Sequence, residues 1–263
     1  MRKTINERFQ EMTKLYHFTS FNAACKIIES RRMIFGKPFK MNDLIESSRI
    51  VFGRVFTNDL SETEQFAEEE IRRYQQISFV QDIERDGFEY LGFDMHTMWG
   101  LYADRGYGVC LVFDKNKLCL KRKDYAKDVD YDLFIPAVFE CKNKSKTGIK
   151  SEIWHRRDEL FFLKRKEWEY EQEFRIIRRA QNANDDEYLD VSDALSFVIV
   201  CKDESVEKGE SIWDVLHCIC LKHLKRKIPV LSYVYDIDWY TLYSENEGDP
   251  IWAEQLGYYC PDF

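Results

Sequence analysis

The chain has 263 residues, of which 44% are hydrophobic and 15% aromatic, with 11 Gly and 5 Pro. This composition provides a sizeable core and excludes both a disordered chain and a repetitive fibre. The formal net charge of -8 argues against a broad nucleic-acid-coating surface, because phosphate binding depends on many Lys and Arg side chains. Eight cysteines lie mostly in apolar runs, and neither an apolar leader nor an 18-residue apolar run is present. We therefore expect free thiols and a cytoplasmic location off the membrane.

The periodicity of apolar residues predicts the elements of the first half of the chain. Ser20 is a good helix N-cap, and residues 21, 24, 25, 27 and 28 recur at helical spacing behind it. In chain order we expect a polar helix over 1–13, a strand over 15–19, a helix from Ser20 to Arg32, a strand over 33–35, a loop over 37–43, a helix over 62–74, a strand over 76–80, a helix over 94–102 and a buried central strand over 107–113.

The second half continues the mixture of strands and helices. The predicted elements are a strand over 135–141, a helix over 150–166, a strand over 171–178, a strand over 195–201, a helix over 211–225 and a strand over 229–235. No internal repeat, low-complexity tract or linker interrupts them. The fold class is therefore α+β, and we expect one domain over residues 1–263.

The most informative segment contains two acids and a base at alternate positions. If it is a strand, Glu171, Glu173 and Arg175 share one face. Charges on a buried face must be paired or hydrogen-bonded, so this face is either exposed to solvent or lines a functional site. An exposed sheet face with an ion pair is the structural interpretation. In the functional interpretation, the carboxylates stabilise positive charge on a sugar carbon when a glycosidic bond breaks.

Three further blocks give the sequence a specific resemblance. Tyr16-His17-Phe18-Thr19 before a helix, together with Glu171-Gln172-Glu173, resembles the ADP-ribosyltransferase superfamily. Within it, the chain is similar to a bacterial and phage-associated branch with an Asn-Asp-Pro-Phe-Glu block, an aromatic block and a Trp-x-x-Glu-x-Glu-x-Arg block. Asn42-Asp43 matches the first block without its Pro, residues 98–113 match the second, and Trp168 to Arg175 match the third. The resemblance implies split mixed or antiparallel sheets with flanking helices, and NAD as the co-substrate.

The resemblance also implies roles for individual residues. His17, flanked by Tyr16 and Thr19, would bind the adenosine-side ribose, and either Trp99 or Tyr102 would stack on the nicotinamide ring. Glu173 would bind the nicotinamide ribose and stabilise the oxocarbenium-like transition state, while Glu171 would orient or deprotonate the acceptor. Asn42 and Asp43 would shape a loop over the cofactor, and Arg175 would steer a diphosphate or pair with Glu173.

Each of these residues also has a purely structural interpretation. A histidine beside a tyrosine on a strand is commonly a satisfied core residue, and without the two acids His17 would carry little functional weight. Trp99 and Tyr102 are three positions apart on a predicted helix, a spacing that equally suits core packing. Arg175 is structural if Glu173 is not free.

The resulting hypothesis is an enzyme that transfers ADP-ribose from NAD to a macromolecular acceptor, either a nucleic acid or a protein. By analogy with related branches it would act as a toxin, with an antitoxin protein as a partner, or in phage defence. One alternative is a noncatalytic nucleotide-binding module of the same fold. Another is a metal-dependent nuclease that uses Glu171, Glu173 and Asp43.

Other signals in the sequence carry less weight. His217, Cys218, Cys220 and His223 crowd into one helix, but the two cysteines point to different sides of it, so we predict no metal site. No Walker loop, Gly-x-Gly-x-x-Gly or Gly-x-Ser-x-Gly element is present. The basic runs at 121–123 and 222–227 are typical of solvated faces, although an acceptor could dock there.

Overall fold

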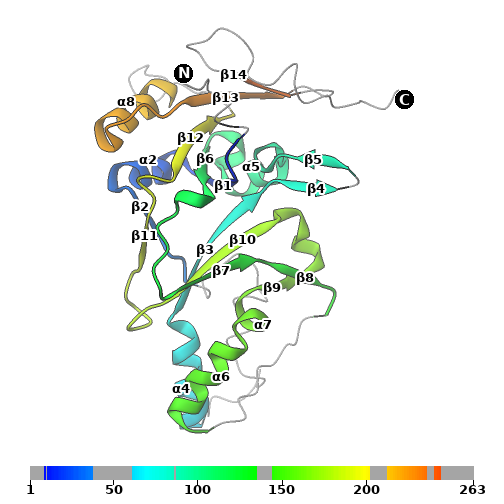
Figure 1. The fold of residues 1–263 in the computed structure, drawn as a ribbon, viewed down its shortest axis with the longest axis vertical. Helices are drawn as coiled ribbons and strands as arrows, with labels where there is room; N and C mark the ends of the chain where they lie inside the picture. Colours follow the sequence, from blue (N-terminus) through cyan, green and yellow to red (C-terminus); the bar gives the residue numbers. More distant parts are fainter. Residues whose placement is uncertain are drawn as a thin grey trace. The chain divides into compact units, whose positions relative to one another are not determined.

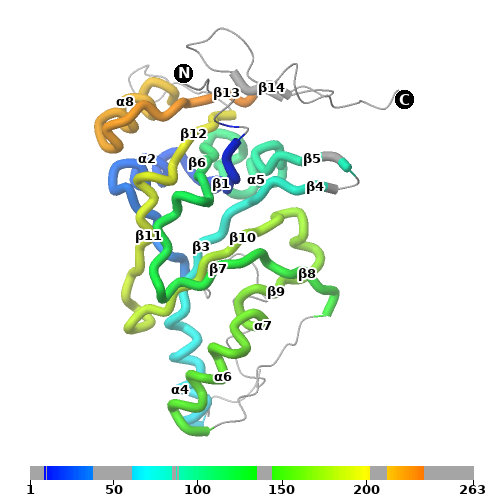
Figure 2. The backbone as a smooth tube through the Cα atoms, in the orientation of Figure 1, coloured from blue at the N-terminus to red at the C-terminus, as the bar shows by residue number. Residues whose placement is uncertain are grey.

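The structure is a computed structural model that describes residues 9, 11–37, 61–85, 87–134, 144–201, 212–235 and 240–243 (Figures 1 and 2). Within these residues the chain forms two compact units. Unit 1 is drawn from residues 1–32, 80–119 and 190–263, and unit 2 from residues 33–79 and 120–189. The chain therefore passes back and forth between the two units, and each is described by itself.

The sheet of unit 1 is built around the buried strand β6 (Val109–Asp114), all six residues of which are buried. β6 pairs antiparallel with β1 (Lys14–Thr19) on one side and with β12 (Leu195–Val200) on the other. β13 (Val230–Tyr235) runs parallel to β12, and β14 (Tyr240–Tyr243) pairs antiparallel with β13. This arrangement makes β6 a central strand, as its continuous apolar sequence predicts.

Two helices of unit 1, α2 (Phe21–Ser30) and α8 (Ile212–Leu224), pack against each other (Figure 1). The Ser20 side chain accepts a hydrogen bond from the amide of Ala23 at 3.3 Å, so the predicted N-cap is confirmed. Arg31 ends α2 in the left-handed conformation, with φ 58°. Ala24 and Ile28 form the buried face of α2.

A second group in unit 1 consists of short elements, two of which contribute to an aromatic core. It consists of the hairpin β4 (Ile83–Arg85) and β5 (Phe88–Tyr90), the 3-10 turns η2 (Gly92–Asp94), η3 (Asp104–Gly106) and η4 (Lys115–Lys117), and the helix α5 (His96–Tyr102). Phe93 of η2 and Trp99 of α5 join one buried aromatic cluster with Phe9, Tyr16, Phe18, Phe197, Tyr233 and smaller apolar residues. Edge-to-face contacts such as Phe18–Trp99, with ring centroids 5.2 Å apart, organise it.

Unit 2 contains most of β3 (Tyr74–Gln81), whose last two residues belong to unit 1, and the strands β10 (Glu173–Arg179) and β7 (Asp124–Asp128). β10 lies between β3 and β7 and is antiparallel to β7. The remaining elements are α4 (Glu62–Arg72), α6 (Lys146–His155), α7 (Arg157–Phe161), η5 (Lys166–Glu171), and the parallel strands β8 (Asp130–Asp132) and β9 (Leu163–Arg165). The short strands β2 (Arg32–Ile34) and β11 (Tyr188–Asp190) pair with each other and cross the division between the units.

The helix α4 shows how local sequence sets a helix start in unit 2. Ser61 and Glu64 form a capping box, in which the Ser61 amide donates to the Glu64 carboxylate at 2.8 Å and the Glu64 amide donates to Ser61 Oγ at 3.3 Å. Ala67 and Ile71, four residues apart, pack into the core of unit 2 together with Ile149 and Ile153 of α6.

The structure confirms the mixed α and β class and most predicted elements, but corrects three. The predicted helix over 150–166 is wrong beyond residue 161, because the backbone leaves the helical conformation at Phe162 and continues as β9. The predicted helix over 94–102 is broken, since Met95 is extended between η2 and α5. The predicted strand over 171–178 begins at Glu173. The predicted strand over 135–141 and most of the helix over 1–13 lie outside the described residues.

No helix among the described residues reaches the length and apolarity that crossing a bilayer requires.

Candidate functional site

The strand that carries His17 lies in unit 1 and exposes its two faces to different surroundings. Tyr16 and Phe18 point into the aromatic core, where Tyr16 is fully buried. His17 and Thr19 occupy the alternate positions and are half-buried. The structure thus separates Tyr16 from the other two residues predicted to bind the cofactor on this strand.

The hydroxyl of Tyr16 is buried close to the carboxylate of Asp82. Burial, followed by the nearby charge of Asp82, raises the pKa of this phenol well above its ordinary value, so it is neutral. A buried, neutral tyrosine in the aromatic core is a packing residue.

A close backbone approach holds the end of β1 against the start of β6. A Cβ placed on Gly108 would lie 2.3 Å from the carbonyl oxygen of Thr19, well inside van der Waals contact. Because glycine has no side chain, the backbone at position 108, just before β6, can lie against the backbone of Thr19 at the end of β1. This requirement explains the glycine that precedes the apolar run 109–113.

The two aromatic residues of α5 have different environments. Trp99 is 4% exposed, its indole N–H donates to the carbonyl of Phe93 at 2.7 Å, and its ring stacks on Tyr233 with centroids 5.7 Å apart. Tyr102, the last residue of α5, is half-buried and packs against the same cluster. Of the two candidates for the ring-stacking role, Trp99 thus packs in the core, and Tyr102 has the more accessible side chain.

The two acids lie in unit 2, at the point where η5 leads into β10. Glu171 is the last residue of η5 and Glu173 the first of β10. Between them Gln172 adopts the left-handed conformation, with φ 43° and ψ 55°, and its amide donates to the carbonyl of Glu169 at 3.1 Å. The two acids therefore share a site because the chain turns at Gln172, and the simple alternation expected of a strand is wrong here.

Lys164 joins the two acids. Its Nζ lies 2.6 Å from Glu171 Oε2 and 3.2 Å from Glu173 Oε2, and it also lies 5.0 Å from the centre of the Trp168 ring. Lys164 comes from β9, whose pairing with β8 sets it opposite Tyr131. The tyrosine hydroxyl accepts a hydrogen bond from the Glu173 amide at 2.9 Å, so β8, β9 and β10 meet at this cluster.

Arg175 completes the cluster from the next inward position of β10. Its Nε donates to Glu173 Oε1 at 2.7 Å, its Nη2 donates to Glu173 Oε2 at 2.9 Å, and its Nη1 donates to the carbonyl of Phe161. The exposed fractions of Lys164, Glu171, Glu173 and Arg175 are only 5%, 5%, 4% and 1%. Two acids and two bases thus form a nearly buried, charge-balanced group, which we call the glutamate cluster.

The cluster keeps Glu173 ionised. Burial alone would raise the pKa of Glu173, but the charges of Arg175 and Lys164 and hydrogen bonds from Arg175 and Ser78 outweigh burial and lower it to about 2. Burial, followed by the charge of Glu173, also raises the pKa of the Tyr131 phenol. At neutral pH the site therefore contains a carboxylate at Glu173 and a protonated phenol beside it.

The predicted site residues are divided between the two units. Glu171, Glu173 and Arg175 meet in unit 2, whereas His17, Thr19 and Tyr102 belong to unit 1. Asn42 and Asp43 lie outside the described residues. Sequence reasoning missed Lys164, Ser78 and Tyr131. Lys166, two residues before Trp168, is exposed and pairs with Glu169 instead of joining the two acids.

Residues 98–176 match the family described as "Protein of unknown function (DUF2971)". No curated protein and no solved structure matched the chain. The matched segment begins within α5 and ends within β10, so it contains Tyr102, Lys164 and the whole sequence from Trp168 to Arg175. Over these residues the chain is similar to that family.

Proposed function

We propose that the chain is an ADP-ribosyltransferase that uses NAD as its co-substrate and transfers ADP-ribose to a macromolecular acceptor. The observation that carries the proposal is the glutamate cluster, where two acids gather at the start of one strand and Glu173 stays ionised in a nearly dry setting. The resemblance of the blocks around His17, Trp99 and Glu173 to that superfamily supports the same reaction. A role as a toxin or in phage defence remains part of this proposal.

The chemistry requires a negative charge that is in place before the reaction starts. When the bond between the ribose carbon and nicotinamide breaks, the electron pair leaves with nicotinamide and positive charge develops on the sugar. An ionised carboxylate fixed by Arg175 and Lys164 stabilises that charge without reorganising, and it does so most strongly where water is excluded. The acceptor then forms a bond to the same carbon and loses a proton, for which Glu171 is the base.

The first test compares Glu173→Gln with Glu169→Gln. Both changes replace a glutamate by its neutral isostere, but Glu169 is only half-buried and pairs with Lys166 outside the cluster. With NAD and a cell extract as the acceptor source, we expect Glu173→Gln to lower nicotinamide release at least about 100-fold, since one electrostatic contact to a transition state is typically worth that much. Glu169→Gln should retain full activity.

A second substitution guards against a folding defect in the first. Glu171→Gln keeps the Arg175 pair of Glu173 intact and should lower transfer to the acceptor more than hydrolysis of NAD. Melting temperatures of all three variants show whether they are folded. Undiminished nicotinamide release by a folded Glu173→Gln protein would remove Glu173 from the mechanism.

One observation favours a second function, a noncatalytic nucleotide-binding module. A carboxylate offers about four lone-pair sites, and Glu173 accepts two hydrogen bonds from Arg175, one from Lys164 and one from Ser78. A ribose hydroxyl must displace one of these donors before Glu173 can bind it. If none is displaced, Glu173 takes no part in catalysis, and the chain would bind a nucleotide through other residues without turnover.

Calorimetry with NAD, run beside an assay of nicotinamide release, separates the two functions. Binding with turnover supports the transferase, and binding without turnover supports the module. The nuclease alternative is less well supported by the cluster, because Lys164 and Arg175 occupy the carboxylate oxygens that a divalent cation would need. Any nucleolytic activity that EDTA abolishes would restore that alternative.

A further inference from the structure

The ends of two helices in unit 1 carry exposed basic side chains. α2 is followed by Arg31 and Arg32, and α8 carries Lys222 in its last turn and is followed by three more bases. All of these side chains are exposed apart from Arg226, which is half-buried. We call this group the basic surface: Arg31, Arg32, Lys222, Lys225, Arg226 and Lys227.

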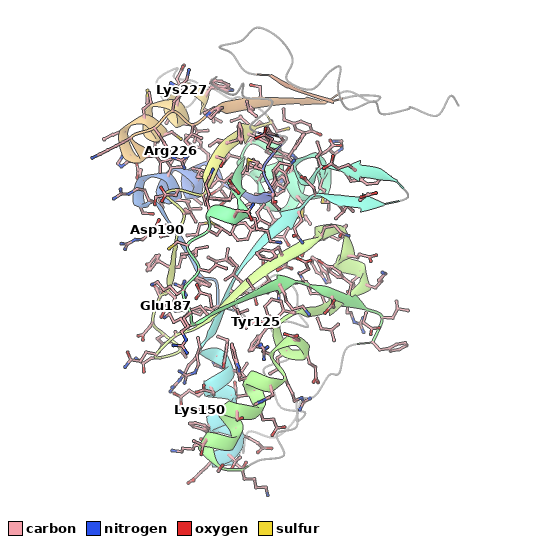
Figure 3. All side chains as sticks on the ribbon, in the orientation of Figure 1. Tyr125, Lys150, Glu187, Asp190, Arg226 and Lys227 are labelled. Atoms are coloured by element: carbon pink, nitrogen blue, oxygen red, sulfur yellow. The ribbon has the colours of Figure 1, made fainter. Side chains whose placement is uncertain are left out.

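Helix packing and hydrogen bonds bring these residues together from distant parts of the chain. α2 packs against α8, and the Arg31 carbonyl accepts a hydrogen bond from the Val191 amide at 3.0 Å. Arg226 Nη2 donates to the carbonyl of Ser192 at 2.7 Å and also to that of Leu195. The turn after β11 thus ties the ends of both helices to one place. In Figure 3, Asp190, Arg226 and Lys227 lie along one flank of unit 1.

The electrostatics of Asp190 agree with this placement. Hydrogen bonds from the side chain and amide of Ser192 lower the pKa of Asp190, and the charges of Arg32 and Arg31 lower it further. The two arginines therefore act on a carboxylate of the β11 turn, the segment that Arg226 also contacts. The two halves of the basic surface share a common neighbour.

The positive charge exceeds what the helices require. A helix end carries about half a negative charge, so two ends together need about one positive charge to offset them. The acids on the two helices and the β11 turn are Glu29, Asp190, Asp193 and Asp214, against the six bases of the basic surface. The surface is therefore locally positive in a chain of net charge -8. Because the Debye length is about 8 Å at physiological ionic strength, a docked polyanion responds to this local charge rather than to the distant acids.

We propose that the basic surface binds the phosphate backbone of a nucleic acid. Lysines and arginines on two neighbouring helix ends suit a chain of regularly spaced phosphates, which needs no enclosed pocket. This inference does not rest on the proposed function, and the binding needs no NAD. If both hold, the nucleic acid is the acceptor class, and the basic surface is where it docks.

The test measures binding of the full chain to a fluorescein-labelled single-stranded RNA of roughly 30 nucleotides by fluorescence anisotropy, at about 50 mM and about 150 mM KCl without NAD. We expect binding that weakens with salt. The variants Lys222→Glu/Lys225→Glu/Lys227→Glu and Arg31→Glu/Arg32→Glu should each lower the affinity at least about 10-fold, because each removes several phosphate contacts.

The matched control changes three exposed lysines of unit 2, as Lys144→Glu/Lys146→Glu/Lys150→Glu. Its net charge changes by the same amount as that of the variant with three lysines of the basic surface replaced. It should bind RNA within about twofold of the unaltered chain, since these lysines lie outside the basic surface. Circular dichroism melting identifies a misfolded variant, and the arginine pair carries the test if the lysine triple unfolds. Failure of the chain to bind RNA at low salt would overturn the proposal, as would an equal loss in the control. Competition by polyglutamate as strong as by unlabelled RNA would instead indicate an acidic protein partner.

Discussion

The two units are stabilised in contrasting ways. In unit 1 the aromatic cluster around Phe93 and Trp99 is almost wholly apolar, and the buried charged residues Lys14 and Asp114 lie outside it, opposite each other at one end of the paired strands β1 and β6. In unit 2 the interior of one strand, β10, carries Glu173, Arg175 and Arg178, each less than 5% exposed. Similar elements therefore enclose two different kinds of interior.

This difference predicts which changes will destabilise each unit. An apolar core loses stability in proportion to the volume and area removed, and largely independently of pH. A buried ion pair contributes little net stability over an apolar pair, yet leaving one partner alone costs several kcal/mol. Unit 2 should thus be sensitive to single charge changes and to acid, and unit 1 to changes in shape.

The largest expected effect is that of Arg178→Met in unit 2. Arg178 binds both carboxylate oxygens of Asp124 at 2.6 and 2.7 Å, and both side chains are 0% exposed. Without the guanidinium, Asp124 remains buried and unpaired, so we expect unfolding free energy to fall by about 3–5 kcal/mol in urea denaturation followed by tryptophan fluorescence.

The control for this prediction is Arg72→Met, which removes an exposed pair with Glu68 and should cost less than about 1 kcal/mol. Adding Asp124→Leu to Arg178→Met should restore at least half of the loss, because the unpaired charge is gone. Equal losses for Arg178→Met and Arg72→Met would show that burial of the pair does not matter.

Acid should destabilise the fold through Glu173. Its pKa is lowered on folding from the ordinary 4.5 to about 2, so its contribution is complete above pH 4.5 and is lost as the pH falls toward 2. The loss is on the order of 3 kcal/mol. The unfolding free energies of the unaltered chain and of Glu173→Gln, measured between pH 7 and pH 2, should converge progressively as the pH falls below 4.5. A constant difference across the range would contradict the prediction.

A smaller effect is expected for Trp99→Phe in unit 1. The change removes the hydrogen bond from Nε1 to the Phe93 carbonyl and part of the buried ring, for an expected cost of about 2 kcal/mol that does not vary between pH 5 and pH 8. Tyr102→Phe, at the half-buried position, should cost less than about 1 kcal/mol. If Trp99→Phe left the stability unchanged but weakened NAD binding, the result would show that Trp99 contacts the cofactor and does not stabilise the core.

The smallest expected effect concerns the turn between the two acids. Gln172→Val places a β-branched residue at φ 43° and should destabilise the chain by about 1–2 kcal/mol. Gln172→Gly relieves that conformation but loses the side-chain bond to Glu169, so its stability should stay within about 0.5 kcal/mol of the unaltered chain. Thermal melts of the two variants check the order, and a Gly variant less stable than the Val variant would reverse it.

The predictable parts of the molecule are those with a long, regular pattern. The apolar run that forms β6, the periodic helices α2 and α8, and the N-cap Ser20 were all expected from their own residues. Three-residue strands such as β4, β8 and β9 were missed, because they are shorter than one recognisable period. In the candidate site, Glu171, Glu173 and Arg175 were found by their spacing, but the turn at Gln172 was not.

Local sequence thus determined the positions of the principal strands and helices, since side-chain period and capping act within a few residues. Tertiary structure decided which charges became partners, because these pairs join residues remote in sequence. Asp124 and Arg178 are 54 positions apart, and Glu70 and Arg179 are 109 apart. Burial made those partnerships necessary, as a charge removed from water requires a counter-charge close by. Lys164 pairs with the two glutamates for that reason, and the sequence around Lys164 does not predict this pairing.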